Sequence, residues 1–442
     1  ARLIALGSRD HLLLGEDMLA RFPYREHPRN IALVRRLAVE LGLDPDLATA
    51  DMAEHVVADL GVLKAYPTIS HRTRRIIFVN GMSANERTGF LSNWQRTGCE
   101  RAVDQQGRWV VTVVNNRFDR VARSQVFADI LVRDAVAERH ILIGTNLSGL
   151  RTYIDTALTH FLPELRLFRD DDPPAKVSEL LVARFQRIRH HLRIGPATPA
   201  ALVAELSGWL GGENMEVLRD DFQEALAAAQ EWANSDSGIT QSALEAKLLP
   251  LSIVRKVAAL RPELGDDLAH HVSRSIARRA MLASLEHAAI NAGTAGSASA
   301  QAALSALQDR MYRELFKELV IPIENSDSTG DQIIDAIARA CPPGIEATVM
   351  GIQNIKGTGL DFAYRFIRYE EVKLLVDRLA QADARQALAI VDELLARRDF
   401  GLFDATLATQ AVKSAAARLS ADSPDVAAAA ALGQAAARLD RS

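Results

Sequence analysis

Short apolar runs alternate with helix-type patterns between residues 76 and 160, and this alternation constrains the possible folds more than any other feature of the chain. The runs are "RIIFVN", "GRWVVTVVNN" and "RHILIG". Apolar residues recur at helical spacing in the stretches that follow them, 84–97, 122–137 and 149–160. Such alternation is typical of βαβ units, in which helices cover both faces of a parallel sheet. We therefore predict an α/β fold.

The alternation stops and later returns. From about residue 174 to 320 only helical spacing is found, broken by turn segments such as "RIGPATP", which predicts five or six helices. The strand pattern resumes in "ELVIPIEN" and "EATVMGI", with a helix opening at "STGDQIIDAI" between them. From residue 369 the chain is again rich in Ala and Leu. We expect a sheet interrupted by a large all-α insertion and followed by a helical tail.

Composition excludes several classes. The 442 residues are 48% hydrophobic, which suits packed cores, and the formal charge of −4 offers no basic excess for nonspecific nucleic-acid binding. Two cysteines suggest a reducing, cytoplasmic setting. No run approaches the roughly 18 apolar residues of a membrane span. The opening "ARLIALGSRD" reads like a strand and lacks an initiator Met, so we expect the natural chain to begin upstream.

Polar residues gather where the predicted strands end. In an open α/β sheet, ligands bind outside the carboxyl ends of the strands, beside the N-termini of the following helices. Three arginines follow the second strand, and Asp119 can pair with one of them; guanidinium groups match phosphate and carboxylate oxygens, so the pattern predicts a pocket for an anionic substrate. Asn as an ordinary turn residue and a surface ion-pair network remain the alternatives. The asparagines are Asn80, Asn115, Asn116, Asn146, Asn325 and Asn354, and the arginines are Arg117, Arg120 and Arg123.

Two further motifs carry charge. "GIQNIKGTGLDF" (351–362) is not a P-loop, because its order is Lys-Gly-Thr, but a Gly-rich turn at a helix N-terminus can bind an anion beside Lys356. The basic segment "RFQRIRHHLR" (184–193) could contact a polyanionic product or form a solvated face. Its paired histidines, like those of "LAHHVSR" (268–274), point about 100° apart on a helix, which favours structural roles over metal binding.

Three segments together resemble a known family. "FVNGMSANE" (78–86), "NNRFDRVARSQVF" (115–127) and "GIQNIKG" (351–357) occur in this order, each after a strand, and resemble the C-terminal half of the ligase subunits of poly-γ-glutamate synthases, which are relatives of the Mur peptide ligases. "FPYREHPRNIALVRRLAVELGLD" resembles the junction and first helix of the Mur C-terminal domain. The resemblance covers roughly residues 1–160 and 320–370.

The resemblance implies a division of the chain. The Mur-ligase C-terminal domain has a Rossmann-like parallel sheet, and here a helical insertion would divide it. We expect the end of a central ATP-binding domain at 1–25, the two parts of the C-terminal domain at 26–164 and 318–372, the insertion at 165–317 and the helical tail at 373–442.

The resemblance also implies an ATP-dependent amide ligase that forms an acyl phosphate, with ATP and Mg²⁺ as cofactors. The chain contains no Gly-Lys-Ser/Thr phosphate loop, so we expect it to be inactive alone and to work with a missing N-terminal ATP-binding half or a companion chain. We expect the magnesium ligands in that part and no metal ligands in this one.

Site residues are carried over from the resemblance by position. Arg117, Asp119, Arg120 and Arg123 would receive the acidic substrate as the catalytic set, and Asn116, Asn354, Lys356 and Gly357 would complete substrate binding. The nucleotide would be contacted by His27, Asn30, Lys64, Asn80, Asn85 and Glu86. The residue types themselves also fit plainer roles, because His27 and Asn30 can cap a helix and Glu86 can be a first-turn acid.

The expected partners follow. The substrate would be an acidic amino acid or polyglutamate, the long helices suggest a homo-oligomer, and membrane-protein partners of a polymer synthase would place the chain in the cytoplasm at the inner face of the membrane. The alternative is a noncatalytic Mur-like platform protein that recruits partners through its insertion and tail. Nucleic-acid binding by the arginines is disfavoured, since only 5% of residues are aromatic. The sequence leaves open which amino acid is used and whether the product is a polymer.

Overall fold

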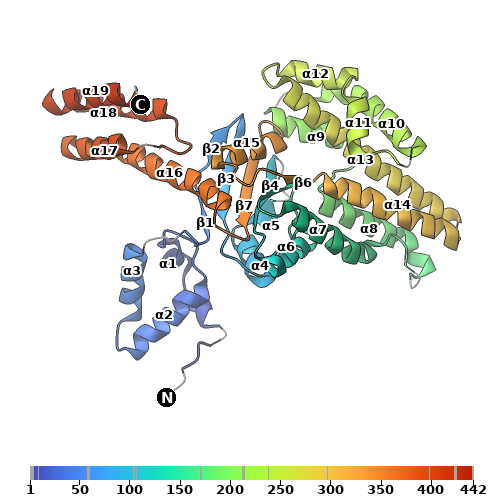
Figure 1. The fold of residues 1–442 in the computed structure, drawn as a ribbon, viewed down its shortest axis with the longest axis horizontal. Coiled ribbons are helices and arrows are strands. Elements are labelled where there is room, and N and C mark those ends of the chain that lie inside the picture. Colours follow the sequence, from blue (N-terminus) through green and yellow to red (C-terminus); the bar gives the residue numbers. More distant parts are fainter. Residues whose placement is uncertain are drawn as a thin grey trace.

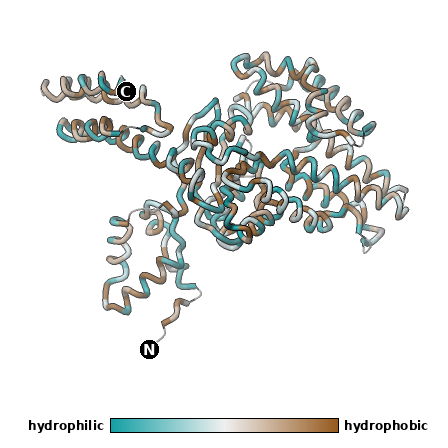
Figure 2. The backbone as a smooth tube through the Cα atoms, viewed as in Figure 1, coloured by the Kyte–Doolittle hydropathy of each residue, from teal (hydrophilic) through white to brown (hydrophobic). Residues whose placement is uncertain are grey.

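The computed structural model describes residues 4–7, 9–56, 60–102, 105, 107–169, 172–211, 215–236, 238–295, 297–397, 399–422 and 426–440. A central sheet with its own helices lies between a large helical lobe on one side and two smaller helical parts, formed by the two ends of the chain, on the other (Figure 1). Hydrophobic and hydrophilic residues alternate along the outer helices (Figure 2), as expected of amphipathic helices. None of the helices described is long and apolar enough to cross a membrane.

The sheet is mixed and mostly parallel. Its order is β1-β3-β7-β4-β5-β6, and β2 also pairs with β3. The five strands from β3 to β6 in this order run parallel, whereas β1 and β2 are antiparallel to β3. The strands are β1 (Lys64–Ala65), β2 (Ile69–His71), β3 (Arg74–Asn80), β4 (Arg108–Asn116), β5 (Arg139–Gly144), β6 (Val320–Pro322) and β7 (Glu346–Ile352).

The α/β prediction is confirmed, but the expectation of a purely parallel sheet is corrected at one edge. Arg72 and Thr73 join β2 to β3 as a two-residue turn, and both have positive φ, 46° and 63°. Turns with two positive φ values match the twist of paired antiparallel strands, so this turn closes a hairpin. The sequence pattern hid the hairpin, because neither turn residue is a glycine.

Helices cover both faces of the sheet for a topological reason. From β3 through β4 and β5 to β6 the chain moves across the sheet in one direction, and it returns from β6 to β7 in the other. Since parallel crossovers are right-handed, the helices of the outward path lie on one face and the helix of the return path on the other. The outward helices are α4 (Arg87–Arg96), α5 (Cys99–Ala102), α6 (Val121–Arg133) and α7 (Leu147–Phe161); α15 (Gly330–Ala340) returns and packs with α16 (Thr358–Leu379).

The helical lobe lies between α7 and β6 in the chain. Seven α-helices are described there rather than the predicted five or six, because turns at Gly211 and at 249–251 divide the chain further. They are α8 (Val177–Leu192), α9 (Pro199–Leu210), α10 (Arg219–Ser235), α11 (Gln241–Leu248), α12 (Ser252–Leu260), α13 (Gly265–Ala295) and α14 (Ala298–Lys317). Single 3-10 turns also occur: η2 (Leu162–Leu165), η3 (Pro174–Lys176) and η4 (Met215–Leu218).

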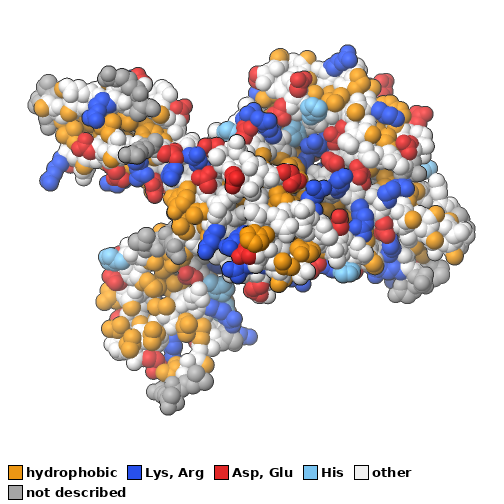
Figure 3. Space-filling model, in the orientation of Figure 1, with side chains coloured by type: hydrophobic (Ala, Val, Ile, Leu, Met, Phe, Trp, Pro, Cys, Tyr) orange, Lys and Arg blue, Asp and Glu red, His pale blue; other side chains and the backbone are white. Residues whose placement is uncertain are grey.

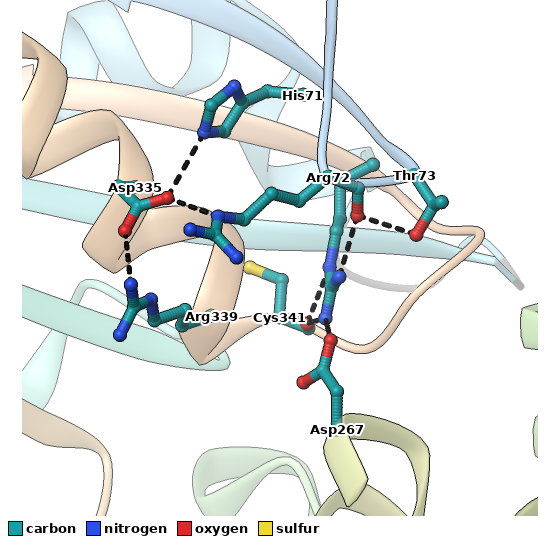
Figure 4. A network of polar contacts seen from close by, with 8 residues as sticks. His71, Arg72, Thr73, Asp267, Asp335, Arg339 and Cys341 are labelled. Carbon is teal, nitrogen blue, oxygen red and sulfur yellow. Dashed lines mark hydrogen bonds and ion pairs between the residues drawn. The ribbon is translucent and has the colours of Figure 1, made fainter. Parts of the chain in front are cut away.

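The lobe and the sheet share one hydrophobic core. A single cluster of buried residues extends from Phe78 on β3 and Val111 on β4 to Phe222 on α10 and Leu285 on α13. Polar contacts add to this joint, where Arg74 at the start of β3 is 2% exposed. Its guanidinium donates to the Cys341 carbonyl oxygen at 2.6 Å and to Asp267 of α13 at 2.6 Å (Figure 4).

The two ends of the chain form smaller helical parts with their own cores. The N-terminal part contains η1 (Asp10–Leu13), α1 (Glu16–Ala20), α2 (Pro28–Glu40) and α3 (Pro45–His55). The strand expected in the opening residues is not found in 4–7 or 9–25, the described part of that stretch. Hydrophobic side chains gather on the visible face of this part (Figure 3), and Leu33, Leu37 and Leu47 of α2 and α3 are more than half exposed.

The C-terminal part continues directly from α16. That helix runs without a break through residue 372, where the sequence suggested a domain boundary. Val372 and Leu379 pack with α17 (Ala384–Ala396), α18 (Ala405–Asp422) and α19 (Val426–Leu439) in a separate cluster.

Candidate functional site

A cavity of about 610 Å³ opens at the carboxyl ends of β4 and β5. Its walls are segments 115–118 and 144–145, the loop 326–329 after β6, and residues 356–358 and Asp361 around the start of α16. The strand-end pocket predicted from the sequence therefore has a counterpart in the structure. We call this feature the strand-end cavity.

Two asparagines join the middle strands beneath this cavity. Asn115 Nδ2 donates to the carbonyl oxygens of Asn354 and Lys356 at 2.9 and 2.8 Å. Asn354 Nδ2 donates back to the Asn115 carbonyl oxygen at 3.0 Å. The side chain of Asn115 also lies against Gly359, where an added Cβ would be 2.3 Å from its amide nitrogen. These amides hold the loop after β7 against the end of β4.

Asn116 makes a similar connection on the other side. Its Nδ2 donates to the carbonyl oxygens of Thr145 and Asn146 at 2.8 and 3.1 Å. Its Oδ1 accepts from Ser124 Oγ at 2.6 Å and from Gln353 Nε2 at 3.1 Å. Gln353 is fully buried, and its φ of 84° is a strained conformation for a residue that is not glycine. The strain is retained because this network of amides fixes the residue.

The arginines after β4 are not equivalent. Arg117 lines the cavity and forms a two-point contact with Asp119, Nε to Oδ1 at 3.0 Å and Nη2 to Oδ2 at 2.7 Å. Arg120 is half exposed and lies 3.7 Å from Asp119. Arg123 instead donates to Asn354 Oδ1 at 2.7 Å. Burial, followed by the charges of Arg120 and Arg117, lowers the pKa of Arg123.

The opposite wall presents Lys356 and backbone N–H groups. Lys356 is exposed, and none of the contacts described for it uses its ammonium group. Gly357 has φ 58° and ψ −130°, which favours glycine, and it precedes α16 without capping it. The residues preceding α6 and α7, Arg120 and Asn146, also make no side-chain cap. Three helix N-termini without side-chain caps therefore begin at this edge of the sheet, where they favour an anion.

Sequence reasoning missed part of the wall. Thr145 accepts from the Phe118 N–H at 3.0 Å, and Thr358 Oγ1 donates to the Ser326 carbonyl oxygen at 2.6 Å. Asp361 accepts from the Gly330 N–H at 2.6 Å and so connects α16 to α15. The Ser328-Thr329 pair was visible as the start of a helix, and Thr329 does form a capping box there. The Ser328-Thr329 pair lies in the same wall as Lys356 only because of where β6 and β7 lie in the sheet.

The residues predicted for nucleotide binding do not line the strand-end cavity. His27 caps α2 by accepting from the Arg29 N–H at 3.2 Å, and Asn30 donates to Glu26 at 2.8 Å. Burial, followed by the charge of Arg96, lowers the pKa of His27. Lys64 forms an ion pair with Glu370 of α16 at 2.7 Å.

The remaining three nucleotide candidates lie at the end of β3. Asn80 is buried and donates to the Leu60 carbonyl oxygen at 2.7 Å. Glu86 caps α4 by accepting from the Gly89 N–H at 2.9 Å, so it precedes the first turn, whereas the plainer role considered for it was a first-turn acid. Asn85 is exposed on the same loop. The six residues therefore fall into separate places, and within the described chain no group of His, Cys, Asp and Glu side chains is arranged to hold a metal ion.

Comparison with known proteins supports the resemblance over the first part of the sheet domain. Residues 65–206 match the family described as poly-gamma-glutamate synthase CapB C-terminal domain. This range contains β3, β4, β5 and α7, and it continues past residue 164 into α8 and α9. No solved structure matches the chain.

Two curated relatives are similar to part of the chain. PGA synthase CapB of Bacillus subtilis (strain 168) is 30% identical over 135 residues, 30% of this chain and 33% of the relative. Capsule biosynthesis protein CapB of Bacillus anthracis is 30% identical over 138 residues, 30% of this chain and 28% of the relative. The chain thus matches about a third of the length of these relatives. Residues 65–206 of the chain are therefore similar to the C-terminal domain of poly-gamma-glutamate synthase CapB.

Proposed function

We propose that this chain supplies the substrate-holding part of a poly-γ-glutamate synthase that works as an ATP-dependent amide ligase. In the proposed reaction a substrate carboxylate becomes an acyl phosphate, and the amine of the next glutamate displaces phosphate. Both the acyl phosphate and the tetrahedral species that follows it are anionic. Side chains and dipoles that are already in place for negative charge lower the barrier to such a step.

The observation that carries this proposal is the position of Arg117 and Lys356. Both line the strand-end cavity, beside the N-terminus of α16. Asp119 orients the Arg117 guanidinium through two contacts, so its planar face is fixed before a ligand arrives. A γ-linked glutamate chain carries one carboxylate per residue, and these groups match a cavity with two cations and uncapped N–H groups.

The proposed reaction needs ATP and Mg²⁺, which we assign to a companion part. The described residues do not make a complete nucleotide site, because the six candidates are dispersed and Lys64 and Glu86 are already engaged in the fold. The role proposed for this chain is therefore limited to binding and orienting the acidic substrate. The chemistry of phosphate activation belongs to the part that holds ATP.

Because the nucleotide candidates already make contacts within the fold, we also consider a second candidate function, that of a noncatalytic platform. If His27, Lys64 and Glu86 act only as caps and as an ion-pair partner, the sheet could be kept for its helical lobe and tail alone. The two candidates differ in one respect. A platform has no need for an acidic ligand at the strand ends.

Binding of γ-linked triglutamate to the 442-residue chain tests the proposal directly. We expect saturable binding by isothermal titration, weakened about tenfold by Arg117→Ala, since a charge-assisted two-point contact would be lost. Arg151→Ala is the control, because Arg151 is an arginine on α7 that does not line the cavity. Absence of binding, or equal binding by both variants, would favour the platform.

Turnover tests the ligase step. In the synthase reconstituted with its companion part, Arg117→Ala should strongly reduce glutamate-dependent phosphate release, while Arg151→Ala should not. Phosphate release that Arg117→Ala leaves unchanged would remove this residue from the proposed site.

A further inference from the structure

A second cavity of about 610 Å³ lies at the opposite end of the sheet, where the helical lobe packs on the starts of β4 and β5. Its walls are residues 107–109 and 138–139 of the sheet region, parts of 189–196 at and after the end of α8, and residues of α9 and α13. β4 is nine residues long, so the two cavities are roughly 26 Å apart along the strand. We call this feature the arginine cavity.

Cations dominate its wall. Two carboxylates, Glu138 and Glu205, line it together with seven arginines: Arg108, Arg139, Arg189, Arg193, Arg274, Arg278 and Arg279. Five of the arginines form ion pairs, for example Arg193 with Glu138 at 2.8 Å and Arg279 with Glu205 at 2.9 Å. The seven guanidinium groups outnumber the five carboxylates that pair with them, so the wall is positive although the chain as a whole is acidic.

Arg139 and Arg278 form no ion pair with any described carboxylate, and both are deeply buried, with 1% and 7% of their surface exposed. Each donates to a backbone carbonyl oxygen, Arg139 to Glu138 and Arg278 to Leu192. The Nε of each is buried without a hydrogen-bond partner. Both side chains line the same cavity, so two buried cations without a paired carboxylate lie against one space. Buried charges without counter-charge are costly, and an anionic ligand would offset that cost.

Neighbouring positive charges also favour an anion in this cavity. Burial, followed by the charge of Arg274, lowers the pKa of Arg139 to about 10. Burial, followed by the charge of Arg139, lowers the pKa of Arg278 to about 9. Both groups nevertheless remain charged at neutral pH. They repel one another and Arg274, and an anion between them would relieve that repulsion.

The cavity is also shaped around these side chains. Gly195 leaves room for the Arg279 guanidinium, because a Cβ there would lie 2.7 Å from Nη2. The Arg139 guanidinium lies 5.1 Å from the centre of the Trp109 ring, which holds its plane. Trp109 and Trp209 both contact the ring of His271, at centroid distances of 6.5 and 6.2 Å. Packed aromatic rings therefore fix the wall from which the guanidinium groups project.

We propose that the arginine cavity binds a small anion carrying at least two carboxylate or phosphate groups, at a site separate from the strand-end cavity. Guanidinium forks accept both kinds of oxyanion in two-point contacts, so the cavity defines the charge and its spacing but not the parent molecule. The basic segment 184–193 contributes Arg189, His190 and Arg193 to the wall, and the anion it was suspected of contacting would be held here. The proposal does not rest on the proposed function.

Titration of the full 442-residue chain with two probes tests the site. Inorganic triphosphate presents phosphate groups and γ-linked triglutamate presents carboxylates, each at constant ionic strength. We expect at least one to bind saturably and raise the Tm, and Arg278→Met to weaken that binding about tenfold while keeping the side-chain volume. Arg274→Gln, at a partly exposed position of the same wall, provides a second variant if Arg278→Met does not fold. Lys356→Ala in the strand-end cavity is the control.

The outcomes are separable. Binding of triphosphate that Arg278→Met or Arg274→Gln weakens and Lys356→Ala leaves intact identifies a phosphate site, and the same pattern with triglutamate identifies a carboxylate site. Triglutamate binding lost only in Lys356→Ala would report the strand-end cavity and support the proposed function, and it would overturn the present proposal if triphosphate binding is also absent or insensitive to the wall variants. Failure of both probes to bind, or binding unaffected by either wall variant, also overturns it.

Discussion

Asn115 and Asn354 each donate a side-chain hydrogen bond to the backbone carbonyl oxygen of the other, at 2.9 and 3.0 Å. The reciprocal pair joins two strands that are neighbours in the sheet but more than two hundred residues apart in the chain. Because both amides are buried, the pair replaces water at the point where the floor of the strand-end cavity is built.

Replacing Asn354 by Ala should lower the free energy of unfolding by about 2 kcal/mol, because the Asn115 carbonyl oxygen and the Arg123 guanidinium would each lose a partner in a buried setting. Urea unfolding followed by circular dichroism measures the change. Asn85→Ala, at an exposed position, should change the same quantity by less than about 0.5 kcal/mol. Equal effects of the two variants would show that the pair does not stabilise the fold.

Gly359→Ala and Gly433→Ala should act in opposite directions. At Gly359 the new Cβ would lie 2.3 Å from Asn115 Nδ2, so the reciprocal pair must shift, and we expect a loss of about 1–3 kcal/mol. Gly433 lies in α19 with nothing within 4 Å of an added Cβ, and there Ala should stabilise the helix by up to about 1 kcal/mol. Thermal unfolding of both variants checks the signs, and a Gly359→Ala protein as stable as the wild type would contradict the close contact.

Arg74→Ala should weaken the joint between sheet and helical lobe. The substitution removes a buried guanidinium that contacts the Cys341 carbonyl oxygen and Asp267, and we expect a cost of about 3 kcal/mol. Arg72 provides the control, because it lies two positions earlier in the chain and belongs to the same polar network (Figure 4). Its side chain is half exposed and forms an ion pair with Asp335. Its replacement by Ala should cost about 1 kcal/mol or less. Similar losses in chemical unfolding would refute the special role of Arg74.

Three buried histidines should make stability fall as the pH is lowered below about 6.5. Burial lowers the pKa of His140 to about 3 and the pKa values of His191 and His271 to about 4. Between the unfolded value and these values, the unfolded chain binds protons that the folded chain does not, so acid favours unfolding. Each histidine contributes about 1.4 kcal/mol per pH unit in this range.

His191→Gln should therefore reduce the dependence of the unfolding free energy on pH by the contribution of one proton, about 1.4 kcal/mol per pH unit. Unfolding in urea at a series of pH values from 7 down to about 4.5 measures this slope. His160→Gln, at an exposed position of α7, is the matched control and should leave the slope near that of the wild type. A slope that does not change in His191→Gln would mean that this imidazole is protonated in the folded protein.

Much of the sheet could be predicted because its pattern is local. "RHILIG" and "EATVMGI" correspond residue for residue to β5 and β7, since strands buried on both faces are continuous apolar runs with abrupt polar ends. The strand ends then placed Asn116, Arg117, Lys356 and Gly357 at one edge, and these four do line one cavity. For candidates with distant partners the residue type was visible but the partner was not, as with Lys64, whose partner Glu370 is 306 positions away.

The helical lobe has features that local sequence patterns did not predict. Turn residues marked most of its breaks, including the end of the 31-residue α13 at Ala295, but the breaks at Gly211 and at 249–251 were not expected. The arginine cavity left almost no trace in the sequence. Its cations come from the starts of two strands, from the end of α8 and from α13, and only the docking of the lobe brings them together.

Spacing and side-chain chemistry along the chain were thus sufficient to identify the parallel strands and the polar character of their carboxyl ends. The place of β7 between β3 and β4, the pairing of Asn115 with Asn354 and the convergence of seven arginines on one cavity arise from contacts between distant segments. Hydrophobic burial drives such contacts and is not directional, so a linear pattern indicates which face is buried without indicating its neighbour.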